Sequence, residues 1–260
     1  MTILTLTTDF GTSDGYIGAL KGVILSLAPG TTLVDLSHSV PPHDVRHGAR
    51  VLATAAPYYA AGTIHLAVVD PGVGSERRGI ALQTPAATFV GPDNGLFTPF
   101  VRERVACVAL ANPATHRCPV SATFHGRDVF APAAAHLANG LPLHELGPAV
   151  DDPLSLPVPQ ARRLPDGRLR AEVVSVDGFG NLATNLRLPS EQGGALDRGA
   201  VRIAIGGEAL ALRSAYADVA PGALLALIGS DGCLEIALRE GSAAERLGLG
   251  LGARVEVWGV

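Results

Sequence analysis

The stretch Ile3-Leu4-Thr5-Leu6-Thr7-Thr8-Asp9-Phe10-Gly11 decides the fold class of this 260-residue chain. Its part Ile3–Thr8 is rich in residues that favour β-strands and is predicted to be a strand, which ends in the acidic turn Asp9-Phe10-Gly11. Apolar residues with helical spacing follow over Tyr16–Leu27 and stop before Pro29-Gly30, and a second strand is predicted at Thr31–Leu36. A strand, a helix and a strand in this order indicate an α/β domain with a mainly parallel sheet.

The same alternation continues to about residue 150. The interval Val51–Val69 carries no formal charge and is long enough to be tested as a membrane span. Pro57 and Gly62 interrupt it, so it predicts a helix end, a turn and a strand instead. The further predicted elements are helices at Asp44–Ala56 and Val129–Ala138, and strands at Ile64–Val69, Gly79–Gln83 and Thr88–Val90.

A second domain is predicted after a proline-rich linker that contains Pro153, Pro157 and Pro159. Short strands follow the linker, and Gly206-Gly207 has the composition of a hairpin turn. We expect an α/β domain at residues 1–155 and a small β domain, a barrel or a sandwich, at residues 165–260. Its predicted strands are Arg168–Val176, Val201–Ile205, Leu224–Ile228, Leu234–Ala237 and Arg254–Trp258.

Composition excludes several classes of protein. Apolar residues make up 47% and charged residues 17%, so a large core is expected and disorder is not. A net charge of −4 argues against a nucleic-acid binder. The first residues lack the basic and apolar regions of a signal peptide, and Cys107, Cys118 and Cys233 lack metal-type spacing, so a cytoplasmic protein is expected. Lysine chemistry would depend on Lys21 alone, which no phosphate-binding loop motif surrounds.

Polar residues gather where predicted strands end. Asp9 follows the first strand, with Asp14 close behind it, and Asp70 follows the third. His125-Gly126-Arg127-Asp128 precedes the last helix of the α/β domain. One such carboxylate is ordinarily a helix cap, but several at the carboxyl edge of one sheet predict a functional cleft.

Three other kinds of site are weighed against this cleft. His38 and His43 lie five residues apart on a proline-containing loop, and no zinc motif is present, so no catalytic metal is predicted. Gly11-Thr12-Ser13-Asp14-Gly15 matches the pattern of a serine hydrolase, but only one strand precedes it. Gly72-Val73-Gly74 does not open a helix as a dinucleotide-binding motif does.

Seven ordered motifs resemble those of the S-adenosyl-L-methionine (SAM) hydroxide adenosyltransferases, which are adenosine-forming SAM hydrolases related to the fluorinase and the chlorinase. The resemblance implies an N-terminal α/β domain, a C-terminal β-barrel, and a homotrimer with active sites between neighbouring subunits. The motifs are Thr8–Gly11, Val34–His38, Val69–Gly74, Gly91–Gly95, Thr123–Asp128, Asp177–Asn181 and the segment from Gly229-Ser230 to Ala237.

The resemblance also implies a reaction. Water or hydroxide attacks the ribose C5′ of SAM, methionine leaves and adenosine forms, with SAM as the substrate and no cofactor. By resemblance, Asp70, Arg77 and His125 hold the attacking water, and either Asp70 or His125 accepts its proton. The alternative for these residues is a surface ion pair beside a histidine with a structural role.

Roles in substrate binding are carried over in the same way. Asp9 matches the carboxylate that binds the ribose diol, because one carboxylate accepts from both hydroxyls. Asp14 and Asp177 match positions near the methionine ammonium group, and Asn181 matches the residue that binds adenine. Ser230 lies in the loop for the methionine carboxylate. Phe124, Glu235 and Leu238 complete the set of candidate binding residues.

Three departures distinguish this chain from its halogenating relatives. Asp70 stands where the halogenases have a tyrosine, and a carboxylate beside the reacting carbon would repel a halide. Gly126 stands where the fluorinase has a serine, although a glycine at this position would also suit a chlorinase. Asp231 replaces an arginine of the halogenase pattern. We therefore predict a SAM hydrolase. The alternatives are a SAM-dependent halogenase and a non-catalytic protein that binds SAM or adenosine.

Overall fold

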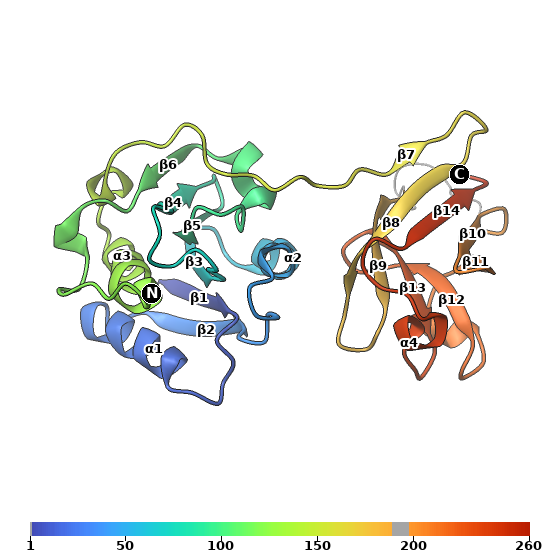
Figure 1. Ribbon diagram of the computed structural model, residues 1–260, viewed down its shortest axis with the longest axis horizontal. Coiled ribbons are helices and arrows are strands. Elements are labelled where there is room, and N and C mark those ends of the chain that lie inside the picture. Colours follow the sequence, from blue (N-terminus) through green and yellow to red (C-terminus); the bar gives the residue numbers. More distant parts are fainter. Residues whose placement is uncertain (1, 189–197) are drawn as a thin grey trace. The chain divides into compact units, whose positions relative to one another are not determined.

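The computed structural model describes residues 2–188 and 198–260, and the chain divides into two compact units, Met1–Leu156 and Pro157–Val260 (Figure 1). The first unit is a mixed α/β domain with a parallel-containing sheet. The second is a closed β-barrel. The predicted fold class is thereby confirmed.

The first unit is built on a six-stranded sheet with the strand order β2-β1-β3-β5-β4-β6. Strands β2, β1, β3 and β5 run parallel, and β4 is antiparallel to both of its neighbours. The strands are β1 Ile3–Thr8, β2 Thr32–Ser37, β3 Thr63–Val68, β4 Gly79–Gln83, β5 Ala87–Pro92 and β6 Ala106–Ala109. Every residue of β3 is buried, as expected for a central strand that is covered on both faces.

Helices cover both faces of this sheet. Leu66 packs in one core with α1 and α3, whereas Ala67 packs in a second core with α2, because successive residues of a strand point to opposite faces. The helices are α1 Tyr16–Leu27, α2 Val45–Ala55 and α3 Ala131–Ala138, with 3₁₀ turns η1 Ala56–Tyr58, η2 Thr98–Glu103, η3 Pro113–Thr115 and η5 Leu143–Leu146. In the described parts of the chain, no helix combines the length and apolar character that crossing a bilayer requires.

Two local features of the first unit agree with the sequence. The side chain of Asp44 caps α2 by accepting the His47 N–H at 2.9 Å. Pro57 lies inside the 3₁₀ turn that ends α2, as the sequence predicts. The last predicted helix differs, because its first turn is the π-helical segment η4 (Gly126–Phe130), which leads into α3.

Seven strands close the barrel of the second unit in the order β14-β10-β11-β12-β13-β9-β8, with β8 pairing back to β14. Ile205 pairs with Glu208 across the predicted Gly206-Gly207 turn, and both glycines have positive φ angles, 58° and 86°. The strands are β7 Arg162–Arg163, β8 Leu169–Val176, β9 Leu182–Arg187, β10 Arg202–Ile205, β11 Glu208–Arg213, β12 Leu224–Ile228, β13 Cys233–Leu238 and β14 Arg254–Trp258, and the short helix is α4 Ala243–Leu247.

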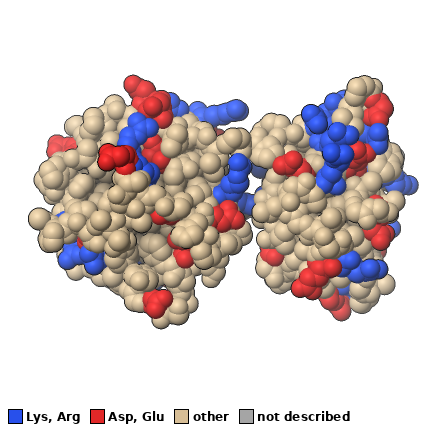
Figure 2. Space-filling model, viewed as in Figure 1, with Lys and Arg blue, Asp and Glu red and all other residues tan. Residues whose placement is uncertain are grey.

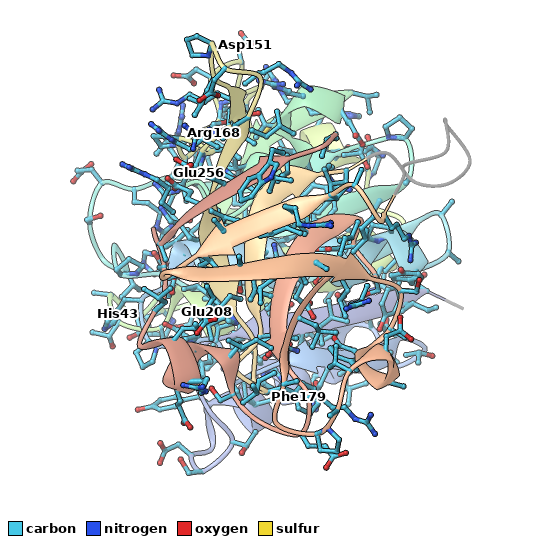
Figure 3. The ribbon with its side chains drawn as sticks, turned by 90° about the vertical axis from the view of Figure 1, so that its right-hand side faces the viewer. His43, Asp151, Arg168, Phe179, Glu208 and Glu256 are labelled. Atoms are coloured by element: carbon cyan, nitrogen blue, oxygen red, sulfur yellow. The ribbon has the colours of Figure 1, made fainter. Side chains whose placement is uncertain are left out.

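Basic side chains gather at the end of the barrel that carries the β7–β8 hairpin (Figure 2). Arg168 forms ion pairs with Asp166 at 2.6 Å and with Glu256 at 2.5 Å, and Arg170 also reaches Glu256. Figure 3 shows Arg168 and Glu256 near one end of the barrel and Phe179 at the other. Acidic side chains therefore neutralise part of the positive charge at this end.

Candidate active site

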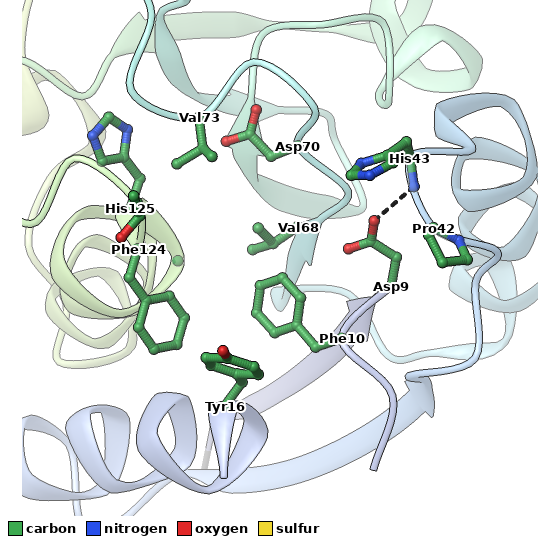
Figure 4. Close-up of a pocket in the computed structure, with 12 residues that line it drawn as sticks. Asp9, Phe10, Tyr16, Pro42, His43, Val68, Asp70, Val73, Phe124 and His125 are labelled. Atoms are coloured by element: carbon green, nitrogen blue, oxygen red, sulfur yellow. Dashed lines mark hydrogen bonds between the residues drawn. The ribbon is translucent and has the colours of Figure 1, made fainter. Parts of the chain in front are cut away.

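A pocket of about 300 Å³ lies in the first unit, where β1 and β3 end (Figure 4). Asp9 follows β1, and Asp70 follows β3 after one further residue. The loop before η4 closes the opposite wall with Thr123, Phe124 and His125. The predicted cleft at the carboxyl ends of the parallel strands is therefore present, and side chains from distant parts of the sequence line it.

Asp70, Arg77 and His125 form one connected group. The Arg77 guanidinium donates to both Asp70 oxygens, from Nε at 3.1 Å and from Nη2 at 2.5 Å. The same Nη2 lies 3.2 Å from His125 Nδ1. The side chains of Arg77 and Asp70 are 9% and 5% exposed, so this pair is not an ordinary surface ion pair.

The charge states in this group follow from burial. Desolvation raises the pKa of Asp70, although the Arg77 charge opposes the rise. Desolvation and the nearby Arg77 charge lower the pKa of His125, so its imidazole is largely neutral at pH 7. Because a guanidinium only donates, Nδ1 is the acceptor and the imidazole proton resides on Nε2. The group thus offers a carboxylate acceptor and an N–H donor.

The loop after β2 fixes Asp9. The His43 N–H donates to Asp9 Oδ2 at 2.9 Å, and the Gly11 N–H donates to the His38 carbonyl at 2.8 Å (Figure 4). His43 adopts a φ of 67°, in the left-handed region that non-glycine residues seldom occupy. One Asp9 oxygen is therefore engaged by the backbone, and the other remains available for a ligand hydroxyl.

Three aromatic rings form another part of the wall. Phe10, Tyr16 and Phe124 meet edge to face, with centroid separations between 5.4 and 6.1 Å. Arg127 lies over the Phe124 ring at 5.0 Å. The pocket therefore combines a polar group around Asp70 with an apolar aromatic surface, as is common for sites that bind small molecules.

Two further candidate residues occupy the β8–β9 turn of the barrel. Asp177 Oδ1 accepts the backbone N–H groups of Phe179 and Asn181, and its Oδ2 accepts the Asn181 side-chain amide at 3.0 Å. Phe179 projects from the same turn and is 79% exposed. The structure brings Asp177 and Asn181 together, and Asn181 keeps its side-chain oxygen for other partners.

The remaining candidates of the barrel lie around β13. Ser230 is exposed in the β12–β13 turn, and Glu235 on β13 accepts the Tyr216 hydroxyl at 2.7 Å. Desolvation, followed by Glu235, raises the pKa of Tyr216 to about 12. Leu238 ends β13 and packs against the barrel core, so its contacts in this unit are structural.

The sequence did not identify every residue of the pocket. In the sequence, Phe10 is only a member of a motif, and Tyr16 is only the first residue of a predicted helix. His43 is considered there only as a metal ligand. In the structure, Phe10 and Tyr16 belong to the pocket wall because their rings contact Phe124. His43 belongs to it because its backbone N–H binds Asp9. Asp14 is exposed and lies outside the pocket lining. No group of three potential metal-binding side chains occurs within residues 2–188 and 198–260.

Comparison with known proteins gives a consistent result. Residues 4–147 match the model of the SAM hydroxide adenosyltransferase N-terminal domain, and residues 171–256 match that of its C-terminal domain. A Salinispora tropica protein named (R)-S-adenosyl-L-methionine hydrolase is 44% identical, covering 98% of this chain and 97% of the relative.

A more distant relative and a solved structure complete the comparison. A fluorinase of Nocardia brasiliensis is 28% identical over 98% of this chain and 96% of its own. The crystal structure of an uncharacterized conserved protein from Thermotoga maritima superposes with a TM-score of 0.89 at 35% identity, covering 98% of this chain and all of that one (100%). The chain is thus more similar to the hydrolase than to the fluorinase.

Proposed function

This chain belongs to the SAM hydroxide adenosyltransferase family, and we propose that it hydrolyses SAM to adenosine and L-methionine. The observation that carries the proposal is the connected, partly buried group of Asp70, Arg77 and His125 at the edge of the pocket. The name of the Salinispora relative, at 44% identity, supports the same activity.

The reaction is a displacement at the ribose C5′. A water oxygen forms a bond to C5′ while the C5′–S bond breaks, and the bonding electrons go to sulfur. The leaving methionine is a neutral thioether that departs from a cationic sulfonium, so no general acid is required. The enzyme has to hold the water in line with the C5′–S bond and remove its proton.

We propose different tasks for Asp70 and His125. His125 donates through Nε2–H and orients the water oxygen, because its Nδ1 is occupied by Arg77. Asp70 accepts the proton, since burial raises the pKa of this carboxyl and makes the carboxylate more basic. Arg77 holds both side chains in place. The proton then passes from Asp70 to solvent.

The same geometry disfavours the halogenase alternative. Asp9 and Asp70 line the pocket, and the Arg77 guanidinium is already bound to Asp70. A halide would approach a carboxylate in a partly dry site, where the repulsion is several-fold stronger than in water. A water molecule meets no such penalty, because it can donate to the carboxylate.

The proposal also covers the substrate, the oligomeric state and the residues that bind the substrate. SAM is the substrate, and the reaction uses neither a metal nor a cofactor. We infer from the family resemblance a cytoplasmic homotrimer whose active sites lie between neighbouring subunits. The roles of Asp9 in binding the ribose, of Asp14 and Asp177 in binding the methionine ammonium, and of Asn181 in binding adenine are part of the proposal. The other proposed substrate-binding residues are Phe124, Ser230, Glu235 and Leu238.

The test is incubation with SAM in ¹⁸O-labelled water without halide, followed by chromatography and mass spectrometry. The two sulfonium diastereomers are assayed separately, because the name of the Salinispora relative specifies the (R) form. Adenosine that carries ¹⁸O at O5′, together with unlabelled methionine, is the expected result. A 5′-halo-5′-deoxyadenosine that forms only after halide is added would make the protein a halogenase. Bound but unchanged SAM would make it a binding protein.

A further inference from the structure

Asp128 is fully buried (0% exposed) and lies outside the pocket lining. Burying a carboxylate is costly unless several donors compensate for its lost hydration. Asp128 accepts from Arg127 Nε and Nη2, both at 2.7 Å, and from Arg117 Nη1 at 3.1 Å. It also accepts the Ser121 N–H at 2.9 Å. One carboxylate therefore joins η4 to both ends of the 117–121 segment.

Two of these partners, Arg127 and Ser121, lead to residues of the pocket wall. Arg127, which Asp128 holds, stacks on the Phe124 ring at 5.0 Å. Ser121, which Asp128 holds by its backbone, has its hydroxyl 3.2 Å from the Thr123 hydroxyl. Asp128 also donates its own N–H to the Phe124 carbonyl at 3.2 Å, across the turn that contains His125. Asp128 therefore holds this wall in position although it does not itself line the pocket.

The segment fixed by Asp128 also lies against the loop that carries Asp70 and Arg77. Gly74 has a φ of 79°, and a Cβ at this position would lie only 2.5 Å from the Ala122 carbonyl oxygen. The loop that carries Arg77 and the segment that precedes His125 are therefore in close backbone contact. A shift of the 117–123 segment would change the Arg77–His125 separation of 3.2 Å.

We propose that Asp128 is a positioning residue that holds His125, Phe124 and Thr123 in the arrangement required to orient the attacking water. The inference rests on the proposed function for its effect on catalysis. It assigns Asp128 no contact with substrate. Arg127 and Ser121 transmit its effect to the wall, and the negative charge of Asp128 acts on His125 through space.

The environment of His125 makes the proposal measurable. The charged groups that act on its imidazole are Arg77 and Asp70 from the loop after β3 and Asp128 from η4. His125 in turn lowers the pKa of His116, which follows η3. Arg77 lowers the pKa of His125, whereas Asp70 and Asp128 raise it. Removing the charge of Asp128 is therefore expected to lower the pKa of His125 further.

The test compares Asp128→Asn with a matched control, Asp93→Asn. Asp93 is 2% exposed, is bound by Arg78 and accepts a backbone N–H from Leu154, but it lies outside the pocket lining. Two quantities are measured for each protein: kcat and KM for SAM over a range of pH, and the pH titration of the His125 imidazole by ¹⁵N NMR.

For Asp128→Asn we expect kcat to fall by about tenfold or more, because misplacing a reacting group by 1 Å can cost on the order of 100-fold. KM should change less than kcat. The His125 titration should move to lower pH. Asp93→Asn should lower stability while leaving kcat and the titration as in the wild type.

If Asp128→Asn behaves like Asp93→Asn, Asp128 is only a stabilising anchor and the proposal is wrong. If Asp128→Asn does not fold, Arg127→Met is measured instead, since it removes the side-chain link from Asp128 to the Phe124 ring at a partly exposed position. That variant should show an intermediate fall in kcat, and wild-type kcat would overturn the proposal. If the wild type does not hydrolyse SAM, the proposed function fails, whereas the titration of His125 still tests the positioning.

Discussion

Arg77 and Arg78 are neighbours in sequence, and each binds a buried carboxylate, but the surroundings of the two pairs differ. Arg77 and Asp70 are both nearly buried, and the guanidinium continues to His125 in the pocket. The Arg78 side chain is 39% exposed and bridges Asp93, whose side chain is 1% exposed, to Asp152, whose side chain is 82% exposed. The same pair of residue types thus faces the pocket of the proposed reaction in one place and anchors the chain before the second unit in the other.

The comparison is informative because both sites contain an arginine paired with a buried aspartate, so that only their surroundings differ. Asp93 uses its second oxygen to accept the Leu154 N–H at 2.7 Å, so its remaining capacity goes to the backbone. Asp70 instead faces a pocket of about 300 Å³. The neighbours of a buried carboxylate, rather than its arginine partner, therefore determine whether it can accept a proton from a ligand.

The largest effect is expected for Asp70→Asn. The amide keeps the shape of the side chain but cannot take a proton from water, so kcat should fall by about 100-fold or more. Single-turnover formation of adenosine from SAM would measure this loss directly. A variant that retains more than about a third of wild-type kcat would remove Asp70 from the proposed mechanism, which assigns general-base catalysis to it.

A second test concerns the core rather than the pocket. His65 lies on β3, is 0% exposed, and has Nδ1 2.7 Å from Thr5 Oγ1. Burial lowers its pKa to about 4, whereas an unfolded histidine has a pKa near 6.5. Since the unfolded state binds the extra proton, stability should be full above pH 6.5 and fall as the pH drops toward 4, by on the order of 3 kcal/mol.

Urea unfolding at several pH values would measure this loss, with His65→Phe as the comparison. The phenylalanine keeps a ring against Phe89 but does not titrate. Because His116 and His125 also have lowered pKa values, the quantity compared is the difference in slope between the two proteins. Equal slopes between pH 4 and pH 6.5 would contradict the assignment to His65.

A smaller effect is expected for Asp93→Asn. Hydrogen bonds to charged groups contribute about 1.5–3 kcal/mol, and the amide retains part of them, so unfolding should become easier by about 1–2 kcal/mol. Activity toward SAM should not change. Denaturant titration combined with kcat would show both. A large fall in kcat without a loss of stability would mean that the Arg78–Asp93 ion pair also contributes to the reaction.

The smallest effect is expected for Asp152→Ala. Its carboxylate is exposed, so water can replace it as a hydrogen-bond partner of Arg78, which keeps Asp93 as its other partner. We expect no measurable change in melting temperature or in kcat. A clear fall in melting temperature by calorimetry would show that the exposed Arg78–Asp152 ion pair is needed to hold the buried Arg78–Asp93 ion pair.

The sequence predicted most of the first unit because its elements have simple patterns. The bounds of β1, α1 and β4 agree with the structure, since strand and helix periodicity and flanking turns coincide there. Strand β6 has the short apolar run Ala106–Ala109, which gave no distinct signal. Strand β11 consists of alanine, leucine and other helix-forming residues, and it is a strand because the Gly206-Gly207 turn pairs it with β10.

The candidate site was predictable where motifs place reactive residue types at strand ends. Asp70 follows a predicted strand and His125 precedes a predicted helix, whereas their grouping with Arg77 came from the family resemblance; the three side chains meet in the structure. The backbone N–H of His43 that fixes Asp9 could not be identified, because any residue type could donate it. Asp128 appeared in a motif, but only its position behind the pocket shows what it connects.

The ion pair of Lys21 has a practical consequence for measuring local opening. Lys21 is the only lysine in the sequence, lies in the middle of α1, and has Nζ 2.7 Å from Asp35 Oδ2 on β2. A lysine-specific protease therefore has one cleavage site, and it lies within a helix. Cleavage requires α1 to open, so the rate of native-state proteolysis would report the free energy of that opening without a competing site. Substrate that binds beside Tyr16 should slow the cut.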